Sequence, residues 1–151
     1  MTSSRMAIYA LLLMASIPGL GFQSVAEAGD QSDGAAAVKL ADLRGTWSGS
    51  FQSKHDNVAP FTVTVVIEPD SHGQLMGKAS HDSPCLSDVD LQVSINGSRI
   101  YLAGSDPEGN SVTFRGTIDR SRTLLSLHYI VNGSAGGRCE SDQGDGNLGK
   151  R

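Results

Sequence analysis

Aromatic residues, cysteine and concentrated charge are all scarce in this sequence. Phe, Trp and Tyr make up 5% of the 151 residues, there are two cysteines and one tryptophan, and the net charge at pH 7 is -4. Nucleic acids and anionic membranes both require a concentrated basic surface, and no cluster of Lys and Arg supplies one. We therefore expect neither nucleic acid nor an anionic membrane to be a partner.

Recognisable catalytic motifs are missing as well. The sequence contains no Gly-x-Ser-x-Gly nucleophile elbow and no Cys-x-x-Cys pair. This absence favours a binding protein over an enzyme, and we expect no cofactor.

The first 28 residues are typical of a secretory signal peptide. Arg5 precedes an apolar run from Met6 to Leu20, and Ala26 and Ala28 provide the small side chains that a signal peptidase accepts. The apolar run is too short to cross a bilayer as a permanent helix. We expect cleavage after Ala28, a periplasmic or secreted location, and no membrane span in the mature chain.

Residues 29–42 carry few apolar side chains, so we expect a flexible N-terminal extension there. Residues 43–151 leave room for a single domain. Apolar and polar residues alternate along this part of the chain, which is typical of strands with one buried face. The predicted strands are Leu43 to Phe51, Phe61 to Ile67, Gln74 to Ser80, Val89 to Ile95, Arg99 to Ala103, Val112 to Ile118, Leu125 to Val131 and a weaker one between Arg138 and Lys150.

Eight short strands without a helical segment predict an all-β, antiparallel, up-and-down barrel, with a two-sheet β-sandwich as the alternative. In a meander the connections alternate between the two ends. The tight turns at 69–73, 96–97 and 119–122 then share one end, and the longer loops at 53–59, 81–87, 104–110 and 132–137 share the other.

A disulfide between Cys85 and Cys139 is expected, because both cysteines lie beside longer loops and an exported chain folds in an oxidising compartment. Closing a loop of this length stabilises a fold by about 4 kcal/mol in the chain-entropy model.

Gly45-Thr46-Trp47 on the first strand, followed by an eight-strand meander, resembles the lipocalins and their wider structural group, which includes avidins and small bacterial protease inhibitors. The resemblance implies that Trp47 plugs the closed end of a barrel. The Thr-Asp-Tyr-type motif of lipocalins is missing, and Arg138 is the candidate for their arginine near the last strand. Avidin-like biotin sites use several tryptophans, so biotin binding is not expected.

Two binding hypotheses follow. In the first, a small apolar or amphipathic molecule enters between the long loops and is held by inward side chains. The candidate ligand-binding residues are Trp47, Val65, Leu91, Phe114, Leu127 and Tyr129. In the second, the loops or residues 29–42 dock onto a protein, as in an inhibitor or immunity factor against a secreted hydrolase.

Several polar residues expected at the long-loop end are of the types used in metal binding or acid–base chemistry. His55-Asp56 and His81-Asp82 are expected there, with Asp88, Asp106, Glu108 and Asn110 nearby, but their spacing matches no short metal motif. We therefore expect these side chains to be solvated. Residues 142–147 superficially resemble a calcium loop, and a flexible turn is the preferred interpretation of that segment.

The disulfide is directly testable in the exported protein. A thiol titration of the denatured, unreduced chain with Ellman's reagent should find no free thiol, and reduction should release both. Free thiols in the freshly isolated protein would contradict the pairing.

Overall fold

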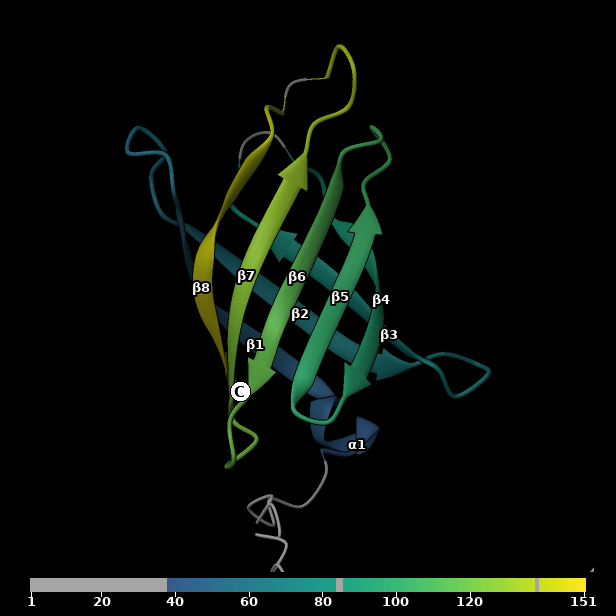
Figure 1. Ribbon diagram of the computed structural model, residues 1–151. Coiled ribbons are helices and arrows are strands. Elements are labelled where there is room, and N and C mark those ends of the chain that lie inside the picture. The colour runs from purple at the N-terminus through teal and green to yellow at the C-terminus, as the bar shows by residue number, and fades with distance from the viewer. Residues whose placement is uncertain (1–37, 84–85, 138) are drawn as a thin grey trace, which may run out of the picture. The chain divides into compact units, whose positions relative to one another are not determined.

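The computed structural model describes residues 38–83, 86–137 and 139–151, and the described part is a closed β-barrel (Figure 1). The predicted eight-stranded antiparallel barrel is confirmed, and the chain does not form the alternative sandwich. A short helix precedes the strands. The elements are α1 (Leu40–Leu43), β1 (Gly45–Ser53), β2 (Phe61–Pro69), β3 (Leu75–His81), β4 (Val89–Asn96), β5 (Arg99–Ser105), β6 (Ser111–Ile118), β7 (Leu124–Asn132) and β8 (Asp142–Lys150).

Each strand pairs antiparallel with the next, and β8 returns to pair with β1. None of the eight strands seen here therefore has a free hydrogen-bonding edge. The connections alternate between the two ends as expected: those after β2, β4 and β6 lie at one end, and those after β1, β3, β5 and β7 lie at the other, where all but the β5–β6 connection are longer. In Figure 1 the longer loops are uppermost and α1 lies below.

Trp47 lies at the tight-turn end, where α1 covers the bottom of the barrel. Its side chain is fully buried and donates its Nε1–H to the Leu43 carbonyl at 2.7 Å. Lys150 places its Nζ 5.2 Å from the Trp47 ring centroid and donates to the Asp42 carbonyl at 2.6 Å. The Asp42 carboxylate pairs with Arg122 at 3.3 Å. Helix, first strand and last strand are thus joined around one indole ring.

This closed end differs in one detail from the sequence-based expectation. Residues 40–42, assigned to the flexible extension, lie in the helical turn of α1. Arg138, the candidate for the lipocalin arginine near the last strand, and residues 29–37 lie outside the described residues.

The glycine-rich segment 142–147 is part of β8, so its interpretation as a flexible turn is wrong. Glycine has low intrinsic strand propensity, but here the missing side chains make room for neighbours. A Cβ on Gly146 would lie 2.4 Å from the Phe51 ring, and one on Gly144 would lie 2.6 Å from the Tyr129 ring. Both aromatic rings therefore pack against bare β8 backbone.

Gly146→Ala should destabilise the barrel by about 1–3 kcal/mol, because the new methyl group overpacks against Phe51. The matched control is Gly149→Ala on the same strand, where the nearest atom to a Cβ is the Ser48 carbonyl oxygen at 3.9 Å. Urea unfolding followed by tryptophan fluorescence measures both variants. Equal stability of the two variants would contradict this account of the glycine.

Candidate functional site

Four aromatic rings form a layer inside the barrel towards the long-loop end. Phe51 stacks on Phe61 with ring centroids 5.9 Å apart, and the edge of Tyr129 meets both rings at 5.7 and 5.2 Å. Phe114 completes the layer at 5.5 Å from Phe51. Offset and edge-to-face contacts of this kind hold aromatic rings in defined positions. The layer provides a rigid apolar floor beneath the loops.

Towards the closed end, beneath this floor, the core contains fully buried side chains such as Val65, Ile67 and Leu91. A separate void beside the floor, at the long-loop end, measures about 10 Å³, near the lower limit for holding one water molecule. Above the floor, a cavity of about 380 Å³ opens between the loops. We call it the mouth pocket. It is lined by His55, Asn57, Val58, Phe61, Ser83, Leu86, Tyr129, Val131, Glu140, Ser141 and Asp142.

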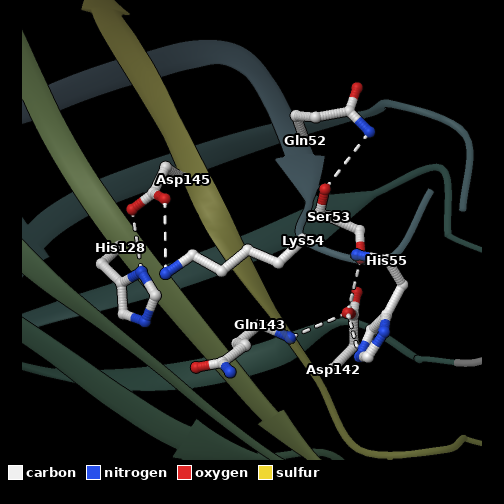
Figure 2. A network of polar contacts seen from close by, with 8 residues as sticks. All are labelled: Gln52, Ser53, Lys54, His55, His128, Asp142, Gln143 and Asp145. Atoms are coloured by element: carbon white, nitrogen blue, oxygen red, sulfur yellow. Dashed lines mark hydrogen bonds and ion pairs between the residues drawn. The ribbon is translucent and has the colours of Figure 1, made fainter.

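Asp142, the first residue of β8, is the best-connected polar group of the mouth pocket. Its carboxylate accepts hydrogen bonds from the Tyr129 hydroxyl at 2.5 Å, the Ser53 hydroxyl at 2.7 Å and its neighbour's backbone N–H, that of Gln143, at 2.8 Å. The His55 Nε2 lies 3.9 Å away (Figure 2). Ser53 also accepts the backbone N–H of His55. The carboxylate is thus oriented from β1, β7 and β8 together.

These contacts set the protonation states. Burial alone would raise the pKa of Asp142, but the hydrogen bonds from Tyr129 and Ser53 outweigh it and leave the pKa below its ordinary value of 3.8. Burial and the bond to Asp142 both raise the pKa of Tyr129. At neutral pH the pocket therefore presents an ionised carboxylate beside a protonated phenol.

Asp106 and Asn110 hold the rim of the barrel together. The Asp106 carboxylate accepts the side-chain amide of Asn110 at 2.8 Å, the backbone N–H of Asn110 at 2.9 Å and that of Glu108 at 3.0 Å, and it accepts the N–H of Ser87 across the rim at 3.3 Å. Asn110 in turn accepts the N–H of Ser134. One buried pair therefore connects three loops, which is a structural role rather than a solvated one.

Burial tends to raise the pKa of Asp106. The hydrogen bonds from Asn110 and the loop backbone oppose this effect, and the resulting pKa lies below the ordinary 3.8.

His55 and His81, both expected at the long-loop end, do not point towards a common site. His81 Nε2 donates to the Ser87 carbonyl at 3.0 Å, while its Nδ1 accepts the N–H of Ser83, so both ring nitrogens hold the β3–β4 loop. His55 is directed towards Asp142 instead. Within residues 38–83, 86–137 and 139–151, no three His, Cys, Asp or Glu side chains are grouped to hold a metal ion.

Of the six candidate ligand-binding residues, Tyr129 alone lines the mouth pocket, and Phe114 lies in the aromatic floor. The other four, Trp47, Val65, Leu91 and Leu127, are buried deeper in the core. Sequence reasoning missed Asp142 and Ser53 as site residues. Their signal was weak, because Asp142 opens a glycine-rich segment and serines are common in this chain.

Two further expectations concern the disulfide and the absence of a membrane span. Cys139 is buried, whereas Cys85 lies outside the described residues, so their pairing stays a prediction. Along the described stretches of chain, the helical content includes nothing long and apolar enough to cross a bilayer.

Comparisons with known proteins identify the fold alone. No protein-family model matches the chain, and no curated protein matches it. A redesigned beta barrel, b11L5F_LGL, matches with a TM-score of 0.54 and 17% identity over 74% of this chain and 94% of the barrel. EF1p2_mFAP2b bound to DFHBI matches with a TM-score of 0.53 and 13% identity over 74% of this chain and 95% of its own.

Asp106→Asn should lower the free energy of unfolding at pH 7 by about 1–3 kcal/mol, because an amide cannot accept all the hydrogen bonds that the buried carboxylate accepts. The difference in free energy of unfolding between Asp106→Asn and the wild type should become smaller at acidic pH. A carboxylate whose pKa is lowered on folding stabilises the protein above its unfolded pKa, and that contribution disappears as the pH falls through the folded pKa.

Urea unfolding between pH 7 and pH 2 measures both effects. The control is Asp56→Asn, an exposed carboxylate on another rim loop. A difference between Asp106→Asn and wild type that stays constant with pH would contradict the assignment.

Proposed function

We propose that this protein is a non-enzymatic, exported, lipocalin-like binding protein that holds one small amphipathic molecule in the mouth pocket. The observation that carries the proposal is a 380 Å³ cavity between an aromatic floor and the long loops. Its volume falls in the range of small-molecule sites, which are about 300–1,000 Å³.

The side chains that line the mouth pocket favour a ligand with an apolar body and a hydrogen-bond donor or cationic group. Phe61, Leu86 and Val131 offer apolar surface, while Asp142 and Glu140 are carboxylates. Asp142 is ionised and held by three donors, so it is ready to accept a further hydrogen bond from a ligand. An amine at one end of an apolar ligand satisfies both features, whereas a carboxylate at that end is repelled.

The architecture agrees with this proposal. The barrel is closed at the Trp47 end by α1 and open at the other, which is the arrangement that the lipocalin resemblance implies. A neighbour of similar fold, EF1p2_mFAP2b, was solved bound to DFHBI. Trp47, Val65 and Leu91, deeper in the barrel, are fully buried, which supports a ligand position at the mouth rather than in the deep core.

Fluorescence titration with the apolar probe N-phenyl-1-naphthylamine tests the site. We expect saturable binding by the wild type, weakened at least about tenfold by Phe61→Asp, which introduces a charge into the apolar floor. The control is Val66→Asp on the same strand, whose exposed side chain lies outside the barrel. Circular dichroism shows whether each variant folds.

Displacement of the probe by decylamine and by decanoate tests the ligand's head group. Decylamine should displace the probe at a lower concentration than decanoate. Asp142→Asn should reduce the difference between these two concentrations. A folded protein that binds no probe, or one that Val66→Asp weakens as much as Phe61→Asp, would overturn the assignment.

A further inference from the structure

A second hollow lies on the outer face of the barrel, away from the mouth pocket. It has a volume of about 870 Å³ and runs over β4, β5, β6 and β7. We call it the outer groove. The side chains that matter for its chemistry are Ser94, Arg99, Tyr101, Arg115, Thr117 and His128.

The strand register places a tyrosine between two arginines. Tyr101 on β5 lies directly opposite Arg115 on β6, and cross-strand partners have Cβ atoms about 4.5–5.5 Å apart. Arg99 precedes Tyr101 by two residues on the same face, a rise of about 7 Å along the strand. The Tyr101 side chain is 47% exposed, unusual for a large ring on a chain with few aromatics.

Among the described residues, no carboxylate pairs with either arginine of the outer groove. Asp145 on β8 accepts from His128 Nδ1 at 2.8 Å and pairs with Lys54 at 3.8 Å (Figure 2). Neither Arg99 nor Arg115 forms an ion pair or side-chain hydrogen bond with any other described residue. Two unpaired guanidinium groups thus share a groove on a chain whose net charge is -4.

We propose that the outer groove binds an acidic oligosaccharide, with its carboxylates on Arg99 and Arg115 and a sugar ring against Tyr101. Guanidinium groups bind carboxylates through paired hydrogen bonds. The apolar face of a pyranose ring packs on an exposed phenol ring. The Ser94 and Thr117 side chains along the groove supply partners for sugar hydroxyls.

The fold favours a saccharide over other anionic chains. The barrel strands have no free edge, so an acidic peptide cannot add a strand and would lose main-chain recognition. Two free cations on an acidic protein fall short of the concentrated basic surface that nucleic acid requires.

Isothermal titration calorimetry of the exported protein with tetragalacturonate tests the proposal, and the fully methyl-esterified tetramer is its uncharged control. We expect binding of the acid but not of the ester. Arg115→Gln and Tyr101→Ala should each weaken it about tenfold. Lys78→Gln, which removes an exposed cation from β3, should leave it unchanged.

Three results would overturn the proposal: equal binding of acid and ester, an equal loss in Lys78→Gln, or tighter binding of polyglutamate or single-stranded DNA than of tetragalacturonate. Phe61→Asp, the mouth-pocket variant, should bind tetragalacturonate as the wild type does. The experiment therefore tests the outer groove separately from the mouth pocket.

Discussion

The closure of β8 onto β1 is the constraint on which the rest of this structure depends. Eight strands form a barrel whose interior is just wide enough for side chains. Phe51 on β1 faces Gly146 on β8, and the absent side chain allows the ring to fill the centre. The mouth pocket, where we propose that a ligand binds, lies on the long-loop side of this aromatic layer.

Side chains along β8 alternate between the inner and the outer face of the barrel, and this alternation places two aspartates in different surroundings. Asp142 and Asp145 are three residues apart, so their side chains point to opposite faces of the sheet. Asp142 faces the mouth pocket, where Tyr129 and Ser53 hold it ionised. Asp145 faces outwards, where it forms a hydrogen bond with His128 and an ion pair with Lys54. Arg99 and Arg115 of the outer groove have no such partner among the described residues.

The loops at the rim of the barrel are held by hydrogen bonds of buried polar side chains. Asp106 and Asn110 are buried polar groups in loops, and their hydrogen bonds replace the strand ladder where the strands end. Together with both ring nitrogens of His81, they fix the β3–β4 and β5–β6 loops around the pocket. Asp106, Asn110 and His81, three of the polar residues considered for metal binding or acid–base chemistry, therefore act here as loop anchors.

The number of strands, their order and the end at which each loop lies could be predicted from the amino-acid sequence, because period-two alternation and turn residues are local properties of the chain. Burial of Trp47 at the closed end was implied by the resemblance to lipocalins. The sequence predicted the last strand only loosely, between Arg138 and Lys150. Tertiary contacts decide that this strand runs through 142–147, that Lys150 covers the tryptophan and that Asp142 belongs to the site. Each depends on residues distant in sequence, such as Phe51 or Tyr129, and no local pattern encodes those contacts.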